Sequence, residues 1–475
     1  MKTWNYDGNG LNFFSAMTRS VSEREVLRGK RIAFVTAGYP GKRFIYDKAK
    51  HLGIEITIID SPQSWSRDLI AEGVIRNFIS IDFGLPHELV VADILDAMRV
   101  QGVQVDGVCT FAEMSLPIAS KLAECLGVPG SPPEVVGMAR DKHMLRKLAS
   151  NSSCFHEVRS YRIICEADLL AGADYVGFPA VLKPVSGADS LGVKKVENLL
   201  ELQESFAEMS ALLARLVVSS GALCRVETGK EQGELASRYI RLDLLLEEYL
   251  DGPEVDVDLV LYKKKCYFAA VVDNGPTKEP FFAETWNLSP SLLPFEKQNE
   301  LIHEAIETVL AVGFTDGVFH VEEKYTNKGA RIVEINARMG GGPVRLMHKC
   351  LYGVDLVVEQ LLSCLGLPPS IPENVLVPAK SRKEGVCVAS CTPNAPRSGT
   401  LRSADFFDKV KSLENLLGAW PFVNAGSPVV GLNQGQPSWL CEIALTGKNG
   451  SAALLEELTR ITDDLVADVD ANYYL

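Results

Sequence analysis

Strands and helices alternate through the first 130 residues, and this order constrains the fold more than any other feature of the sequence. Short apolar runs bounded by turn residues are typical of buried strands, and the stretches between them have helical spacing. Strands are expected at 31–36, 54–59 and 107–111, and helices at 44–52, 88–101 and 116–126. Such alternation predicts a parallel sheet with right-handed crossovers. The turn after the first strand lacks G-x-G-x-x-G, which argues against a dinucleotide site.

The chain has 475 residues, which predicts about three domains. Hydrophobic residues make up 47% and charged residues 23%, which excludes a disordered chain or a collagen-like fibre. The 61 Asp and Glu outnumber the 48 Lys and Arg, for a formal net charge of −13. Because this chain lacks the cationic excess that releases counterions from phosphate backbones, we expect no nucleic-acid partner.

The 11 cysteines are dispersed and form no C-x-x-C pair, so we expect free thiols of a reducing compartment and no zinc site. The N-terminal segment lacks the continuous apolar stretch of a secretory signal. No run of about 18 apolar residues predicts a membrane-spanning helix. The sequence therefore favours a cytoplasmic protein without a membrane partner.

A lysine and a loop of small residues follow an apolar strand near residue 180. The strand delivers Lys183 at its end, and the loop contains Ser186, Gly187, Ser190 and Gly192. Glycines allow close backbone approach, so successive N–H groups can surround phosphate oxygens, and a lysine adds a point charge. A hairpin with a surface lysine explains the same residues equally well.

A second apolar strand, expected at 242–249, runs into carboxylates and a turn. It carries Glu247 and Glu248, and Leu250 precedes an Asp-Gly-Pro turn that leads to Glu254. An extended hinge offers backbone N–H and C=O groups to a purine edge, and a carboxylate past the turn can accept hydrogen bonds from ribose hydroxyls. An exposed turn with ordinary acids is the alternative interpretation.

Two strands, at 317–324 and 331–336, face each other across the turn at 326–329, which is a clear hairpin signal. Side chains alternate along a strand, so Glu334 shares one face with the next two polar residues along the chain, which are Asn336 and Arg338.

Glu322 on the facing strand can lie on the same face as Glu334. Two carboxylates and an amide oxygen suit Mg²⁺, and Arg338 beside them would stabilise negative charge that develops in phosphoryl transfer. Three polar residues on a half-exposed edge strand are the alternative. The glycine-rich loop at 339–343, which includes Gly341, favours the metal interpretation because it also exposes backbone groups.

Lys142 follows Arg140 and Asp141 near the start of a predicted helix at 134–150. A lysine in this position can reach an α-phosphate, although charges at helix starts are usually only solvated. The Gly- and Pro-rich segment 127–133 lies just before it and predicts a domain boundary.

These four segments, in this order, resemble the ATP-grasp family over residues 30–365, and the Glu-Ile-Asn-x-Arg signature at 334–338 is specific. The family strand usually has a proline where this chain has Ala337, which leaves every ligand in place. The resemblance implies an α/β and α+β protein with the ATP-grasp fold: an N-terminal Rossmann-like domain, a small α+β domain and a larger α+β domain. The expected boundaries are an extension at 1–29, the Rossmann-like domain at 30–133, the small domain at 134–250, the large domain with the metal site at 251–368, and a C-terminal α+β module at 369–475.

The resemblance also implies roles for the residues above. ATP would lie between the small and large domains and use Mg²⁺ as two ions, with Mn²⁺ as a substitute. The implied roles are phosphate contacts for Lys142 and Lys183, a mobile phosphate loop from Ser186 to Gly192, adenine contacts around Glu247, Glu248 and Leu250, ribose binding by Glu254, metal binding by Glu322, Glu334 and Asn336, and catalysis by Arg338.

Two further parts of the sequence resemble the carnosine synthases: the stretch 272–290, and the stretch 316–322 continuing to 336–341. The bacterial L-amino-acid ligases share this layout more loosely. The implied reaction is ATP-dependent ligation of two amino acids, preferably β-alanine and L-histidine, through an acyl phosphate. Glu284 is the candidate partner for an ammonium group or an imidazole, with Arg338 and Gly341 on the substrate side; a surface acid is the alternative for Glu284.

A ligase that makes another dipeptide has the same motifs and stays open. A carboxylase or purine-pathway ligase lacks support in the segment around Glu284. A non-catalytic nucleotide-binding protein is expected to have lost at least one of the three candidate metal ligands. All three, Glu322, Glu334 and Asn336, are present here. Apart from amino-acid substrates, the partner suggested by family analogy is a second copy of the chain. For the C-terminal module, a lid over the substrate end and an assembly surface are equal expectations.

Overall fold

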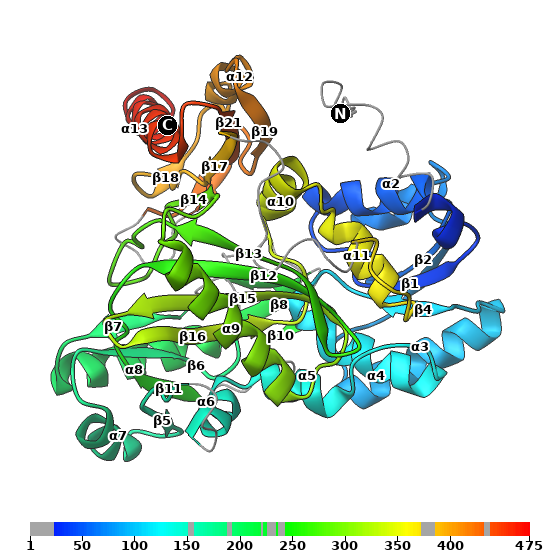
Figure 1. The fold of residues 1–475 in the computed structure, drawn as a ribbon, viewed down its shortest axis with the longest axis horizontal. Coiled ribbons are helices and arrows are strands. Elements are labelled where there is room, and N and C mark those ends of the chain that lie inside the picture. Colours follow the sequence, from blue (N-terminus) through cyan, green and yellow to red (C-terminus); the bar gives the residue numbers. More distant parts are fainter. Residues whose placement is uncertain are drawn as a thin grey trace.

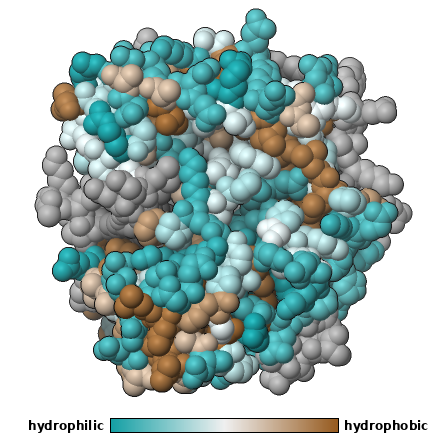
Figure 2. Space-filling model, turned by 90° about the vertical axis from the view of Figure 1, so that its left-hand side faces the viewer, coloured by the Kyte–Doolittle hydropathy of each residue, from teal (hydrophilic) through white to brown (hydrophobic). Residues whose placement is uncertain are grey.

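The computed structural model describes residues 23–150, 156–187, 192–219, 222–225, 234–235, 243–371, 385–431 and 438–475. Ser190, expected in the phosphate loop, lies outside these residues. No helix in the described ranges is long and apolar enough to cross a membrane. Figure 2 shows one face of the molecule, on which hydrophilic residues predominate.

The N-terminal domain is built on a four-stranded parallel sheet, as the alternation predicts. Its strand order is β3-β2-β1-β4. The strands are β1 (Arg31–Val35), β2 (Glu55–Asp60), β3 (Asn77–Ser80) and β4 (Gly107–Cys109), and the helices are α2 (Arg43–His51), α3 (His87–Gln101) and α4 (Leu116–Leu126). The edge strand β3 was not predicted from the sequence, because it has only four residues and a mixed burial pattern.

The next unit carries an antiparallel sheet in the order β5-β11-β6-β7. The predicted helix at 134–150 is two helices, because Asp141 has an extended backbone and its carboxylate accepts a hydrogen bond from the Met144 N–H at 3.0 Å. The elements are α5 (Pro133–Arg140), α6 (Lys142–Ser150), β5 (Ser160–Ile163), α7 (Asp168–Val176), β6 (Ala180–Pro184), β7 (Lys194–Val196), α8 (Leu199–Leu213) and β11 (Leu244–Glu248), with β8 (Leu216–Ser219), β9 (Ala222–Arg225) and β10 (Glu234–Leu235) in a separate sheet.

The largest sheet has eight strands in the order β16-β15-β12-β13-β14-β17-β21-β19. Its first five strands belong to the expected large domain: β12 (Glu254–Tyr262), β13 (Lys265–Asn274), β14 (Trp286–Ser289), β15 (Gly317–Thr326) and β16 (Gly329–Asn336). The hairpin of β15 and β16 is confirmed by their antiparallel pairing. Helix α9 (Phe295–Val312) packs on one face of this sheet, as Figure 1 shows.

The remaining three strands of this sheet come from beyond the expected boundary at 368/369. Strand β17 (Cys387–Cys391) pairs with β14, and β21 (Cys441–Gly447) lies between β17 and β19 (Leu416–Pro421). The C-terminal module therefore continues the central sheet, and it is completed by β18 (Gly399–Thr400), α12 (Phe406–Lys411), β20 (Pro428–Val429) and α13 (Ser451–Asn472).

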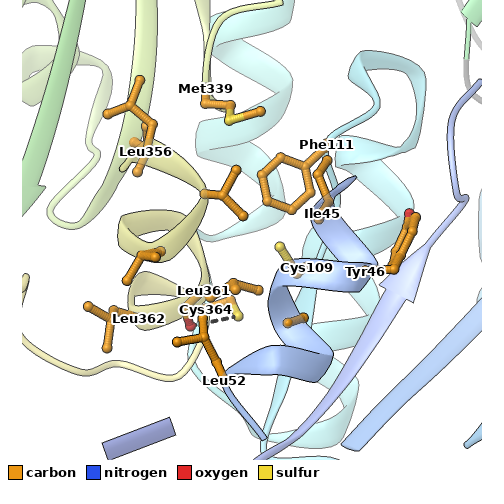
Figure 3. Packing of buried hydrophobic residues seen from close by; sticks show 14 of the residues in the cluster. Ile45, Tyr46, Leu52, Cys109, Phe111, Met339, Leu356, Leu361, Leu362 and Cys364 are labelled. Atoms are coloured by element: carbon orange, nitrogen blue, oxygen red, sulfur yellow. Dashed lines mark hydrogen bonds between the residues drawn. The ribbon is translucent and has the colours of Figure 1, made fainter. Parts of the chain in front are cut away.

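Two helices that the sequence reasoning did not identify, α10 (Val344–Tyr352) and α11 (Leu356–Ser363), connect the central sheet to the N-terminal domain. Figure 3 shows Leu361 and Cys364 near Leu52 and Cys109 of that domain, in one cluster of buried side chains. This shared core fixes the N-terminal domain against the strand β16 region that carries Arg338.

Candidate functional site

A cleft of about 280 Å³ lies between the small-domain sheet, the central sheet and the C-terminal module. It brings together most of the residues selected from the sequence, although these come from distant parts of the chain. Those that line it are Lys142, Lys183, Gly187, Glu247, Glu248, Leu250, Glu254, Glu284, Glu322, Glu334, Asn336, Arg338 and Gly341. Ser186 and Gly192 are not among the lining residues; the Ser186 hydroxyl donates to the carbonyl of Arg140 at 3.1 Å.

Glu322 and Glu334 are direct cross-strand partners in the β15–β16 hairpin, so their side chains lie on the same face of the sheet. Asn336 lies on that face as well, and its Nδ2 donates to Glu322 Oε1 at 3.2 Å. The Lys142 ammonium lies 2.9 Å from Glu334 Oε1. Asp256 on β12, which the sequence reasoning did not select, is the cross-strand partner of Glu322 on its other side.

This cluster of oxygens fits a divalent cation. Burial, and then the charge of Glu334, raise the pKa of Glu322 to about 8, so two adjacent carboxylates here repel each other unless a cation or a proton compensates them. In the described ranges, no group of three or more His, Cys, Asp or Glu side chains has the arrangement of a metal site. Any ion here would therefore use the two glutamates, the amide oxygen of Asn336 and oxygens of a ligand, which is the usual environment of Mg²⁺ beside phosphates.

Arg338 is fixed by a carboxylate from the N-terminal domain. Its Nε donates to Glu113 Oε2 at 3.0 Å, and its Nη2 lies 3.4 Å from Asn336 Oδ1. Glu113 is buried and also accepts from Arg140 Nε at 3.1 Å. Glu113 was not expected from the sequence, because no local pattern marks a residue that acts across a domain boundary.

Lys183 and Glu247 form a buried ion pair with a third residue, Arg146. Lys183 Nζ donates to Glu247 Oε1 at 2.8 Å, and Arg146 Nε donates to Glu247 Oε2 at 2.9 Å. Burial opposes the charged form of Glu247, but the two cations outweigh it and lower its pKa to about 2. The Glu247 carboxylate is therefore held by side chains, and Arg146, which the sequence reasoning did not select, also donates to the Val333 carbonyl at 3.0 Å.

The hinge after β11 forms another side of the cleft. Lys324 on β15 donates to the Leu250 carbonyl at 3.4 Å and lies 3.8 Å from Glu254 Oε2. Burial raises the pKa of Glu254, and the charge of Lys324 opposes this effect. Glu248 is bound instead by Arg159, whose backbone N–H and Nε donate to it at 3.0 and 3.1 Å.

A buried network supports the sheet beneath the carboxylates. Asp258 lies 3.0 Å from His320 Nδ1 and 2.7 Å from His348 Nε2, through its two different oxygens. Although burial opposes protonation of His320, the carboxylates of Asp256 and Asp258 raise its pKa to about 10. His320 thus adds a positive charge two residues from Glu322, on the same face of β15.

Glu284 and Gly341 also line the cleft, and both are exposed. The backbone carbonyl of Glu284 accepts from Asn394 Nδ2 at 3.2 Å, so this loop contacts the C-terminal module. That module contributes four lining residues that the sequence reasoning did not identify, since they stand in unremarkable stretches: Thr392, Phe422, Trp439 and Glu442.

Comparisons with known proteins agree with this geometry. Residues 176–345 match the ATP-grasp domain model and residues 46–130 match the ATP-grasp N-terminal domain model. Carnosine synthase 1 of Gallus gallus is 31% identical over 385 residues, which are 79% of this chain and 39% of that protein. Alanine–anticapsin ligase of Bacillus subtilis is 25% identical over 320 residues, which are 65% of this chain and 63% of that protein.

The crystal structure of an L-amino acid ligase from Bacillus licheniformis has the same fold, with a TM-score of 0.75 and 20% identity, over 92% of this chain and 98% of that chain. The chain spans about two-fifths of the length of the carnosine synthases that it matches. The fold, both domain models and the arrangement of the cleft agree, and the chain therefore belongs to the ATP-grasp family of ligases.

Proposed function

We propose that this protein is an ATP-dependent carboxylate–amine ligase that joins two amino acids through an acyl phosphate, with β-alanine and L-histidine as the preferred pair. The observation that carries the proposal is the cross-strand pair Glu322 and Glu334, which shares one cleft with Lys142, Lys183 and Arg338. Carboxylates, an amide and three cations in one cleft are suited to phosphoryl transfer, where catalysis is mostly positioning and charge stabilisation.

The proposed reaction has two steps. An oxygen of the donor carboxylate attacks the γ-phosphorus of ATP, the bond to the bridging oxygen breaks, and ADP leaves. The amine of the second amino acid then attacks the acyl carbon and forms the carbon–nitrogen bond. The bond from the acyl carbon to the phosphate oxygen breaks, phosphate leaves with its electron pair, and the amine loses a proton to phosphate or solvent. Lys142, Lys183 and Arg338 would bind the phosphoryl oxygens, and Arg338 would also stabilise the oxyanion of the second step.

Enzymes of the ATP-grasp family use ATP with Mg²⁺. In this chain we propose that Glu322, Glu334 and Asn336 hold two ions, for which Mn²⁺ can substitute. The metal would neutralise charge on the transferred phosphoryl group. For the nucleotide, we propose that Glu247, Glu248 and Leu250 form the adenine side and Glu254 binds ribose. Ser186, Gly187, Ser190 and Gly192 stay proposed members of the phosphate loop.

The choice of β-alanine and L-histidine is supported by the similarity to carnosine synthase 1 and by the acid Glu284 in the cleft. The second candidate is a ligase that makes a different dipeptide, favoured by the similarity to alanine–anticapsin ligase. The presence of both glutamates and Asn336 opposes a non-catalytic nucleotide-binding role.

We propose the cytoplasm as the location, because reducing conditions suit the nine cysteines that the structure describes as free thiols. A homodimer stays a prediction.

The decisive experiment is a matrix of amino-acid pairs incubated with Mg-ATP, with phosphate release measured and product masses determined. Carnosine as the main product supports the preferred pair, and another dipeptide supports the second candidate. Arg338→Ala serves as the control, because removing one preorganised donor is expected to lower kcat by about 10²- to 10³-fold. Phosphate release that needs no amino acid, or that Arg338→Ala leaves unchanged, would contradict the proposal.

A further inference from the structure

The C-terminal module forms one wall of the cleft through its sheet. Strand β17 pairs with β14, and β21 pairs with β17, so the module is hydrogen-bonded to the sheet that carries Glu322 and Glu334. Its side chains are therefore held at fixed positions relative to the site. One of them, Glu442 on β21, lines the cleft while only 5% of the residue is exposed.

Glu442 is a buried carboxylate without a protein partner in the described part of the chain. No described group donates a hydrogen bond to it or forms an ion pair with it, and the charge that acts on it is that of Arg345. Arg345 instead stacks on Phe44, with its guanidinium carbon 3.6 Å from the ring centroid. Burial raises the pKa of Glu442 to about 7, and Arg345 opposes this effect. Because leaving a buried carboxylate unpaired is costly, the position suits a cationic ligand.

Aromatic side chains also line this cleft, and among them are Trp286, Phe422 and Trp439. The rings of Phe422 and Trp439 are 5.9 Å apart at an angle of 44°. The indole ring of Trp286 on β14 packs directly against Gly275. A Cβ atom on residue 275 would lie only 2.7 Å from the ring. Aromatic faces attract organic cations and exclude water, so the walls favour a ligand cation over a hydrated inorganic one.

Glu442 also lies close to the loop that follows Arg338. A Cβ atom placed on Gly342 would be 3.8 Å from Glu442 Oε2, and Gly341, Gly342 and Arg338 line the same cleft. A small molecule whose carboxylate is activated beside Arg338 could therefore present its other end to Glu442. This arrangement suits a short amino acid, which has a carboxylate at one end and an ammonium group at the other.

We propose that Glu442 binds the ammonium group of the acyl donor, the amino acid whose carboxylate is phosphorylated. This inference rests on the proposed ligase function and extends it to the choice of donor. Both substrates of such a ligase carry an amine, and a free amine on the donor would compete with the acceptor as nucleophile. A carboxylate partner keeps the donor amine protonated and also rejects acids that lack the amine.

The test is Glu442→Gln, which keeps the shape of the side chain and removes its charge. In wild-type enzyme, the kcat/KM of the donor amino acid should greatly exceed that of the matching acid without the amine, which is propionate for β-alanine. The substitution should lower kcat/KM for the amino acid by about 10- to 100-fold, since a hydrogen bond to a charged group is worth about 1.5–3 kcal/mol. It should leave kcat/KM for the deamino acid and KM for the acceptor within about threefold.

Folding is checked on the same samples. Burial of the Glu442 charge is unfavourable for the folded protein. The Glu442→Gln variant should therefore have an unfolding temperature at pH 8 that is no lower than that of the wild type. Glu456→Gln, an exposed position on α13 in the same module, is the matched control and should behave as wild type in both assays.

The outcomes separate the two proposals. An equal loss for the amino acid and its deamino analogue, or a changed KM for the acceptor alone, would overturn the role of Glu442 while leaving the ligase function intact. The role of Glu442 would also be overturned if Glu442→Gln preferred the amino acid over its deamino analogue as strongly as the wild type does. If the wild-type enzyme releases no phosphate with any amino-acid pair, both proposals fail together.

Discussion

At the scale of single residues, a carboxylate from the N-terminal domain holds Arg338 in place. Glu113 accepts from Arg338 Nε at 3.0 Å and from Arg140 Nε at 3.1 Å, in a buried position. We expect Glu113→Gln to lower kcat by about 10- to 100-fold, because supporting hydrogen bonds of this kind typically have such effects on a site. Steady-state phosphate release measures it. An unchanged kcat would mean that Arg338 holds its position without Glu113.

A second prediction at this scale concerns pH and stability. Burial raises the pKa of Glu359 on α11 from its ordinary value of 4.5 to about 7, although two hydrogen bonds from Ser370 oppose the shift. The folded protein thus binds this proton more tightly than the unfolded chain. The free energy of unfolding should fall as the pH rises from about 5 to about 7, by up to about 3 kcal/mol.

Glu359→Gln tests this prediction, because an amide cannot lose the proton. Urea unfolding of both proteins at pH 5 and pH 8 should give a smaller difference between the two pH values for the variant. The same pH dependence in both proteins would show that Glu359 does not contribute to it.

At the scale of elements, helix α11 connects the N-terminal domain to the central sheet. Leu361 is fully buried in the shared core, next to the residues that Figure 3 labels. Leu361→Ala should lower the free energy of unfolding by about 2–5 kcal/mol, because it removes apolar contacts and leaves a cavity. Leu89→Ala, at a position that is 53% exposed on α3, is the matched control and should change it by less than about 0.5 kcal/mol. Equal shifts of the denaturant midpoint would contradict this role of α11.

At the scale of the whole molecule, the cleft is assembled from every part of the chain. Lys142 and Lys183 come from the small-domain region, Glu334 from the central sheet and Glu442 from the C-terminal module. A nucleotide that contacts both lysines and the metal bound by Glu334 would connect the small-domain region to the central sheet, so it should stabilise both. At 100 times its Kd, Mg-ATP is expected to raise the free energy of unfolding by about 2.7 kcal/mol.

Thermal unfolding with Mg-ATP, with ATP plus EDTA, and with Mg²⁺ alone measures this effect. Stabilisation should be largest with Mg-ATP and should decrease when EDTA removes the metal, since the two glutamates then face the phosphates without a cation between them. Equal stabilisation by ATP in EDTA would argue against metal binding by Glu322 and Glu334.

Features that arise between neighbouring residues could be predicted from the amino-acid sequence alone. The parallel sheet follows from alternating strands and helices, and the β15–β16 hairpin follows from its turn and from apolar periodicity. The common face of Glu334 and Asn336 follows from the two-residue repeat of a strand. These features depend on residues that are close in the sequence, so their physical cause can be read there.

Contacts between distant segments could be identified only from the folded structure. Arg338 and Glu113 are 225 positions apart, and Arg146 and Glu247 are 101 positions apart. The strands of the C-terminal module join the central sheet, and Glu442 reaches the cleft, through pairing that no local pattern marks. Such contacts depend on how whole helices and strands pack against one another. Two charged side chains that are distant in the sequence form a buried ion pair only when the packing of their elements places them side by side.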